Sequence, residues 1–226
     1  MKFFKDIPSN LIDKLNIPSK VAIVGNSNEL LKNDYGKLID EYSYVIRFNR
    51  SPTEGFEKIV GSKTSLRVFN EQFFMNKSND FKGKESEKFN FDYINKTTHN
   101  ANLLILYLSN LDNLKNKNLF SKTNKINYIN SSINHKLKYH LVSNFNFFKK
   151  LKFYLHNSDL TSGAFILCLL VYFNYKPDVF GFNFNKNNEN YSMYYSSILE
   201  QPFAHDFNNE NYLLERIKNK NRAKFY

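Results

Sequence analysis

Short apolar runs that end in polar turns recur along this 226-residue chain. Residues 20–24 form a β-branched run that stops at Gly25, and residues 44–48 and 65–69 form two similar runs. Residues 102–108 are apolar almost throughout. Runs of this length that are bounded by turn residues predict buried strands, which are typical of a parallel sheet.

Two longer segments predict helices. Residues 163–174 are apolar over more positions than a strand usually has, which indicates a buried helix, and residues 177–180 predict the strand that follows it. Residues 207–222 predict an amphipathic helix with Asp206 as its N-cap. Strands interleaved with helices predict an α/β fold, a single domain over residues 1–226 with a mostly parallel sheet flanked by helices.

Charge changes this picture only in part. The chain has 32 Lys and Arg against 21 Asp and Glu, a formal net charge of +11. Such a surplus favours anionic partners, among them an anionic membrane surface or a phosphorylated glycan. The abundance of Phe, Tyr, Asn, Lys and Ile also fits an AT-rich genome, so a solvated basic surface without a partner remains the alternative. No nucleic-acid-binding motif is visible, and nucleic acid is not an expected partner.

The cysteine content and the two terminal segments predict the cellular location. Cys168 is the only cysteine, so no internal disulfide can form, and its apolar surroundings indicate a core residue. No segment reaches the roughly 18 apolar residues of a membrane span, and residues 1–6 lack the apolar stretch of a signal peptide. We therefore expect a cytoplasmic protein. The basic tail 216–226, which ends in Phe225 and Tyr226, predicts peripheral contact with the inner face of an anionic membrane.

Three polar sites adjoin the predicted strands and helices. Gly25-Asn-Ser27 closes the first strand, where α/β folds gather ligands, although an ordinary strand-to-helix turn explains it almost as well. Thr161-Ser-Gly163 opens the apolar helix, where it can meet a ligand or simply cap the helix. Arg47 is a candidate phosphate ligand because its planar fork pairs two oxygens, and the alternative is an ion pair with Glu57.

The order and spacing of these pieces resemble a known family. Gly25-Asn-Ser27, Arg47-Phe-Asn49 and Gly55-Phe-Glu57 precede residues 60–64, Val-Gly-Ser-Lys-Thr. Together these segments are similar to the large motif of the eukaryotic-type sialyltransferases, glycosyltransferase family 29.

Two further pieces continue the resemblance. Thr161-Ser-Gly163 is followed by Asp178 and Val179-Phe-Gly-Phe182, as in the small motif of that family, and His205 with Glu210 resembles the very small motif. The cysteine pair of animal members is replaced by Val21 and Asn174. The chain therefore resembles a disulfide-free, bacterial-like member, and the resemblance implies a Rossmann-like, GT-A-like fold.

The resemblance also implies a role for each matching residue. His205 would be the general base. Glu210 would orient the pocket or interact with the dipole of its own helix, and Tyr194 or Tyr195 would contact the leaving phosphate unless the two form a packed pair. The residues implied in binding the CMP part of the donor are Gly25, Asn26, Ser27, Asn49, Thr161, Ser162, Gly163, Gly181 and Phe182.

The function implied is an inverting transfer of a sialic-acid-like sugar from a CMP-sugar donor to the hydroxyl of a glycan or glycolipid. No Asp-x-Asp is present, and we expect a reaction that needs no metal and no other cofactor. Two alternatives stay open: a transferase that uses CMP-Kdo, and a nucleotide-binding module without catalytic activity.

Overall fold

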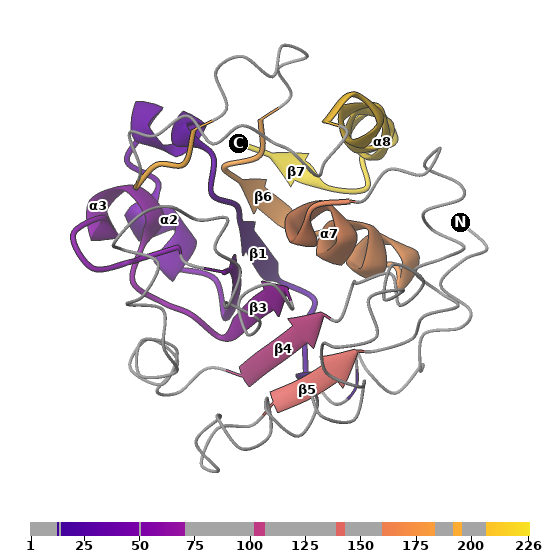
Figure 1. The fold of residues 1–226 in the computed structure, drawn as a ribbon, viewed down its shortest axis with the longest axis horizontal. Coiled ribbons are helices and arrows are strands. Elements are labelled where there is room, and N and C mark those ends of the chain that lie inside the picture. The colour runs from indigo at the N-terminus through magenta and orange to yellow at the C-terminus, as the bar shows by residue number, and fades with distance from the viewer. Residues whose placement is uncertain are drawn as a thin grey trace, which may run out of the picture.

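A parallel sheet forms the centre of the molecule. The computed structural model describes residues 13, 15–49, 51–70, 102–106, 139–142, 160–183, 192–195 and 207–226, without the side chains at 70, 102–106, 139–142, 207 and 208. The strands are β1 (Val21–Val24), β2 (Tyr44–Phe48), β3 (Leu66–Asn70), β4 (Asn102–Leu106), β5 (Tyr139–Val142), β6 (Asp178–Phe180) and β7 (Lys224–Phe225). Their order across the sheet is β5-β4-β3-β2-β1-β6-β7, and every described pair is parallel (Figure 1).

Helices cover both faces of this sheet. The 3₁₀ helix η2 (Asn28–Lys32) and the helices α2 (Gly36–Asp40) and α3 (Glu57–Val60) lie on one side. The helices α7 (Ser162–Tyr172) and α8 (Phe207–Asn219) lie on the other, with α7 running across the strands in Figure 1. The α/β prediction with a parallel sheet flanked by helices is confirmed.

The alternation of side chains along β1 explains why its run is apolar without interruption. Val21 and Ile23 point to the core that contains α7 and α8, whereas Ala22 and Val24 point to the core that contains η2, α2 and α3. All four side chains are fully buried. A strand that is covered on both faces has no solvent side, so every position favours an apolar residue.

Helix α7 is buried along most of its length, which explains its uniform apolar sequence. Thr161 is its N-cap, and the Thr161 Oγ1 accepts a hydrogen bond from the Ala164 N–H at 3.2 Å. Arg222 donates to the carbonyl of Val171 at 2.8 Å near the other end, where carbonyls of a helix lack partners within it. Cys168 is buried among the core residues, as predicted, and burial raises the pKa of its thiol.

The amphipathic prediction for the last helix is confirmed in its described part. Leu214 and Ile217 are buried against the core, and Leu213 packs beside them. The helix ends at Asn219, before the predicted position 222. The proposed N-cap, Asp206, lies outside the described residues.

Among the described strands, β5 and β7 were not predicted. Lys224–Phe225 pairs with β6, and the Phe225 ring packs against the core. The Tyr226 ring stacks on Phe180 with centroids 4.4 Å apart. The folded sheet therefore buries both aromatic side chains in part. Membrane contact through the exposed basic residues of the tail stays a prediction, as does the single domain over residues 1–226.

Within the described residues, no helix combines the length and the apolar character needed to cross a bilayer.

We expect the ring of Phe180 to contribute strongly to the stability of the protein at the β6–β7 edge. It is fully buried, stacked on Tyr226 and met edge-on by Tyr35 at 5.5 Å and by Tyr42 at 6.0 Å. Phe180→Ala should lower the free energy of unfolding by about 3–5 kcal/mol, because the cavity cannot close on three sides. Chemical denaturation checks this. The control Tyr212→Ala removes a ring that is 64% exposed and should cost less than about 1 kcal/mol. Equal losses in the two variants would contradict the packing described here.

Candidate functional site

The order of the strands creates a topological switch point, a place where ligands of α/β proteins commonly bind. The chain leaves β1 toward β2, continues to β5, and returns on the opposite side of β1 as β6. Loops that follow neighbouring strands diverge at such a switch point and leave room at their carboxyl ends. Gly25-Asn-Ser27 follows β1, and Gly181 and Phe182 follow β6. Both predicted donor segments therefore lie at the switch point.

These two segments are hydrogen-bonded to each other. The N–H of Gly25 donates to the carbonyl of Phe180 at 2.8 Å, and the N–H of Ser27 donates to the carbonyl of Gly181 at 3.2 Å. A Cβ on Gly25 would lie 2.4 Å from the Gly181 oxygen, which is shorter than any tolerated contact. Gly181 itself has φ +68°, a left-handed conformation that favours glycine.

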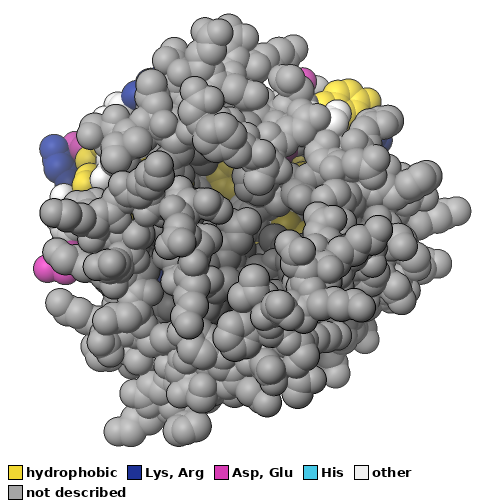
Figure 2. Space-filling model, viewed as in Figure 1, with side chains coloured by type: hydrophobic (Ala, Val, Ile, Leu, Met, Phe, Trp, Pro, Cys, Tyr) yellow, Lys and Arg dark blue, Asp and Glu magenta, His cyan; other side chains and the backbone are white. Residues whose placement is uncertain are grey.

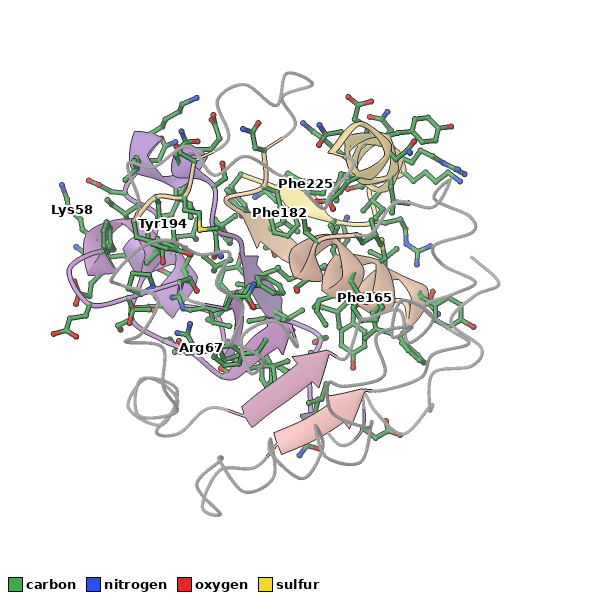
Figure 3. All side chains as sticks on the ribbon, viewed as in Figure 1. Lys58, Arg67, Phe165, Phe182, Tyr194 and Phe225 are labelled. Atoms are coloured by element: carbon green, nitrogen blue, oxygen red, sulfur yellow. The ribbon has the colours of Figure 1, made fainter. Side chains whose placement is uncertain are left out.

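The Phe182 ring connects this contact to the start of α7. A Cβ on Gly25 would lie 2.9 Å from the Phe182 Cδ2, and a Cβ on Gly163 would lie 2.9 Å from its Cζ. The half-buried ring therefore lies between the turn after β1 and the N-terminus of α7, as Figure 3 also shows. Gly25, Gly163, Gly181 and Phe182, which the sequence predicted to share a site, are brought together.

A fourth segment, residues 192–195, covers the turn after β1. Ser27 and Met193 form an antiparallel bridge. The N–H of Asn28 donates to the carbonyl of Ser192, and the N–H of Tyr194 donates to the carbonyl of Asn26, both at 3.0 Å. Residues far apart in the sequence therefore fix the backbone around Asn26.

The side chains of Asn26 and Ser27 have different roles. The Asn26 Oδ1 is buried and has no hydrogen-bond partner among the described residues, which is rare for a buried amide oxygen. The Ser27 Oγ accepts from the N–H of Glu29 at 3.2 Å and caps η2. The first motif thus retains one acceptor for a ligand, on Asn26. Asn28 begins η2 and has no positive φ.

The positive φ occurs instead at Asn49, where it equals +45°. The last paired residues of β1 and β2 are Val24 and Arg47, so Asn26 and Asn49 each follow two residues later. They lie at the same edge of neighbouring strands, as their predicted shared role requires. The backbone of Asn49 donates to the Val68 carbonyl at 2.8 Å and accepts from Arg67 at 3.0 Å.

The start of α7 also carries hydrogen-bond donors. Thr161 uses its hydroxyl as the N-cap, so the capping role considered for it is confirmed. In the described part of the chain, no partner is found for the N–H groups of Ser162 and Gly163 or for the Ser162 hydroxyl. Free N–H groups at the start of a helix form a suitable site for an anion or for ribose oxygens.

Glu210 joins α8 to the start of α7. Its carboxylate accepts from the Thr161 N–H at 2.8 Å and from the Thr161 hydroxyl at 2.9 Å. The side chain is 6% exposed. Its charge therefore faces the positive end of the α7 dipole, which stabilises a buried carboxylate. Of the two roles considered for Glu210, the structure favours orientation of the pocket, because its partner belongs to the predicted donor segment.

Arg47 is a structural residue, which corrects both readings of it. It is fully buried and donates to the carbonyls of Val60, Gly61 and Lys63, at 2.7–3.2 Å, and to the Thr64 hydroxyl at 3.1 Å. Burial lowers the pKa of this guanidinium to about 10. Glu57 binds instead the N–H of Gly55. The sequence did not reveal this role, because the backbone carbonyls that bind Nε and Nη2 have no sequence signal. The Nη1 of Arg47 is buried and has no partner among the described residues.

The two tyrosines form the packed pair that was the alternative to phosphate binding. Their rings meet edge-to-face at 5.0 Å. Tyr194 is 4% exposed, and its hydroxyl donates to the Pro52 carbonyl, so the phosphate contact predicted for Tyr194 is wrong. Figure 3 places Tyr194 on the side of α2 and α3. For Tyr195, which is half-buried, the phosphate contact stays a prediction.

The predicted base, His205, lies outside the described residues, five positions before Glu210. Its role therefore stays a prediction. Glu210, which follows His205 in the same predicted motif, is hydrogen-bonded to Thr161.

A separate surface depression of about 580 Å³ lies between α2 and α3. Basic and acidic side chains lie together on that margin of the molecule in Figure 2, and Lys58 pairs with Asp34 at 2.9 Å. The Asp40 carboxylate there binds Ser62 and Lys63; although burial raises the pKa of Asp40, these hydrogen bonds lower it overall. Glu57 of the large motif lines the depression, and none of the residues predicted to bind the donor does. Among the described residues, no cluster of His, Cys, Asp and Glu has the composition of a metal site.

The fold is an α/β fold with polar turns at its switch point, and the family comparison identifies which α/β proteins it belongs to. A sequence model of Glycosyltransferase family 29 (sialyltransferase) matches residues 2–222. The chain therefore belongs to this glycosyltransferase family. The resemblance inferred from the motifs is confirmed.

Curated relatives match over shorter segments. Beta-1,6-galactosyltransferase GALT29A of Arabidopsis thaliana is 55% identical over 49 residues, 22% of this chain and 12% of that protein. CMP-N-acetylneuraminate-beta-galactosamide-alpha-2,3-sialyltransferase 1 of Sus scrofa is 42% identical over 77 residues, 32% of this chain and 22% of that protein. Human beta-galactoside alpha-2,6-sialyltransferase 2 is 42% identical over 60 residues, 26% of this chain and 11% of that protein. The matches thus span less than a quarter of each relative.

Two solved structures share the fold. The crystal structure of a mammalian sialyltransferase in complex with Gal-beta-1-3GalNAc-ortho-nitrophenol has a TM-score of 0.61 and 20% identity, covering 99% of this chain and 76% of that one. A second crystal structure of a mammalian sialyltransferase has a TM-score of 0.59 and 19% identity, covering 99% of this chain and 83% of that one. Both support the Rossmann-like architecture.

The Glu210–Thr161 contact predicts a measurable share of stability. Glu210→Ala should lower the free energy of unfolding by about 1–3 kcal/mol, because it leaves a backbone N–H and a hydroxyl without their acceptor. Chemical denaturation measures the loss. The matched control is Glu215→Ala on the same helix, where the half-exposed carboxylate has no described partner and the change should be within about 0.5 kcal/mol. A loss no larger than that of the control would show that the contact contributes nothing.

Proposed function

We propose that this protein transfers a sialic-acid-like sugar from a CMP-sugar donor to the hydroxyl of a glycan or glycolipid. One observation carries the proposal: family motifs from distant parts of the chain meet at the switch point with unused hydrogen-bonding groups. Asn26 contributes a buried acceptor, and Ser162 and Gly163 contribute donors. A nucleoside monophosphate has hydroxyl donors for the former and oxygen acceptors for the latter.

The nature of the donor is supported by the relatives. The name of the Sus scrofa enzyme includes CMP-N-acetylneuraminate, and its identity with this chain is 42% over the matched segment. The same motif residues bind CMP in this proposal: Asn26 and Asn49 from the ends of β1 and β2, and Ser162 with Gly163 from the start of α7. Transfer of any sugar from its CMP ester would use this same nucleotide site, so a CMP-Kdo donor remains the second choice.

The reaction assigned to this site is a direct displacement. The acceptor oxygen attacks the anomeric carbon while the bond from that carbon to the phosphate oxygen breaks, which inverts the configuration. CMP leaves with the bonding electrons, and the proton of the acceptor hydroxyl passes to His205. A histidine ordinarily titrates near pH 6.5, which suits a general base near neutrality.

We propose that this displacement needs no metal. The predicted donor-binding residues include no pair of carboxylates, and the leaving CMP carries a single phosphate that helix N–H groups can stabilise. We also propose a cytoplasmic location, supported by the single, buried cysteine. Contact with an anionic membrane would involve the exposed basic side chains of α8 and the residues after it.

One relative favours a second candidate. The highest identity among the relatives named above, 55%, belongs to a plant protein named as a galactosyltransferase. A galactose donor would carry a different nucleotide. The nucleotide that this protein binds therefore separates the candidates.

CMP should stabilise the protein more than other nucleotides do. At a CMP concentration one hundred times its Kd, binding contributes about 2.7 kcal/mol, a rise in Tm that thermal-shift assays resolve easily. UMP, UDP, GMP and AMP form the comparison, and the assay is repeated in EDTA.

Asn26→Ala should weaken CMP binding by about 1–3 kcal/mol, because it removes the buried acceptor.

Three outcomes would change the proposal. A larger shift with UDP than with CMP would favour the galactosyl candidate. Loss of CMP binding in EDTA would end the metal-free proposal. Unchanged CMP affinity in Asn26→Ala would remove the turn after β1 from the donor site.

Loss of His205 should abolish transfer and preserve donor binding. His205→Ala should lower kcat by ~10²–10⁴-fold with CMP affinity nearly unchanged, because the base acts on the acceptor. The pH–rate profile of the wild type should rise through the range near pH 6.5, since neutral imidazole is the active form. Single-turnover kinetics measure both.

The matched control is His99→Ala, a histidine outside the motifs, which should retain turnover. A stable and fully active His205→Ala protein would refute the assignment of the base. A CMP-binding wild type without transferase activity on any donor would favour the non-catalytic module.

A further inference from the structure

Two buried arginines lie side by side on the face of the sheet that α2 and α3 cover. Arg47 in β2 and Arg67 in β3 are register partners and are 0% and 1% exposed. Side chains of paired residues in parallel strands point to the same face. Because a buried charge is costly without partners, each guanidinium must be held by acceptors. The acceptors of the two arginines come from different loops.

Arg67 binds the loop that follows β2. Its Nη1 donates to the carbonyl of Asn49 at 3.0 Å, to the carbonyl of Ser51 at 3.0 Å and to the Ser51 Oγ at 3.3 Å. Ser51 is fully buried. Hydrogen bonds from a charged donor are stronger than neutral ones, and shielding from water preserves them. The loop is therefore fixed from the side of β3; Figure 3 shows Arg67 there.

The same loop is fixed from the opposite side by Tyr194. Its hydroxyl donates to the Pro52 carbonyl, and its N–H donates to the Asn26 carbonyl at 3.0 Å. Tyr194 therefore joins the loop after β2 to the turn after β1. Arg67 and Tyr194 together determine how Asn49 lies relative to Asn26.

Asn49 needs such support because of its backbone. A φ of +45° is uncommon for a residue other than glycine and persists only where the surroundings hold it. The carbonyl of Asn49 is bound by Arg67, and its N–H is bound by Val68, the next residue of β3. Strand β3 thus supports this conformation twice.

We propose that Arg67 is a positioning residue for the donor nucleotide. It holds the loop after β2 by three acceptors, and through the Asn49 carbonyl it keeps the Asn49 side chain at the nucleotide site. It does not contact the nucleotide itself. This inference rests on the proposed function, because it requires that Asn49 binds CMP.

A double-mutant cycle tests the inference by calorimetric titration with CMP. Arg67→Lys keeps the charge but loses the planar fork, and should weaken CMP binding about tenfold. Asn49→Gly allows the same φ and removes only the side chain, and should also weaken CMP binding about tenfold. The double variant should bind CMP no more weakly than Asn49→Gly alone, since Arg67 acts only through that side chain.

Arg47→Lys is the matched control. Arg47 is as deeply buried, but its bonds go to residues 60–64 and none reaches the loop after β2. Arg47→Lys should lower Tm. Because its bonds do not reach the loop after β2, the CMP affinity should change less than about threefold. Arg67→Met supplies a second variant of similar length, and circular dichroism confirms folding before each titration.

The outcomes separate the inference from the function on which it rests. If the wild type binds no CMP, the proposed function fails and the inference with it. If Asn49→Gly weakens binding but Arg67→Lys does not, or if their losses add in full, only the inference is overturned. If both Arg67 variants fail to fold while Arg47→Lys folds, Arg67 is a requirement of the fold and the inference is also overturned.

Discussion

The close contact between the turn after β1 and the turn after β6 determines the geometry of the whole site. Gly25 approaches the carbonyl of Gly181 so closely that a single Cβ would collide with it. Because these strands are neighbours at the switch point, the contact fixes the two turns that follow them relative to each other. The Phe182 ring then fills the space up to Gly163, so the start of α7 is placed by the same contact. Small residues occur where the backbones meet, and this requirement is geometric.

Buried charged side chains hold the loops that this contact does not reach. Arg47 and Arg67 extend from β2 and β3 and bind backbone carbonyls of the loops beside them, and Glu210 binds the N–H of Thr161, the N-cap of α7. In each case a charged side chain meets groups of the backbone that lack a partner in their own element. Such bonds hold irregular segments with the rigidity of the sheet, which a site on loops requires. The family signature therefore includes residues that shape the pocket without touching a ligand.

The sequence predicted the elements whose burial is uniform and missed those that depend on distant partners. Residues 44–48 have the limits that were predicted, because a strand covered on both faces is apolar at nearly every position, with Arg47 as the exception here. Strand β7 was missed since two residues carry no periodicity and pair only once β6 is in place. Arg47 was misread because the carbonyls that bind it have no signature. The same reason hid Arg67, for which only the strand pattern around it gave any signal.

The described cations are not arranged to hold the phosphate of the donor. Although the formal net charge is +11, the two arginines nearest the motif loops are engaged by carbonyls, and those of α8 and the tail lie mostly at the surface. In the described part of the site, the polar groups without a partner include the Asn26 Oδ1 and the N–H groups of Ser162 and Gly163. Dipoles held rigidly in a crevice stabilise a single negative charge without a buried counter-ion. In the function proposed above, these groups would stabilise the single phosphate of a nucleoside monophosphate. The choice between the CMP-sugar and galactosyl candidates therefore depends on whether the nucleotide that binds carries one phosphate or two.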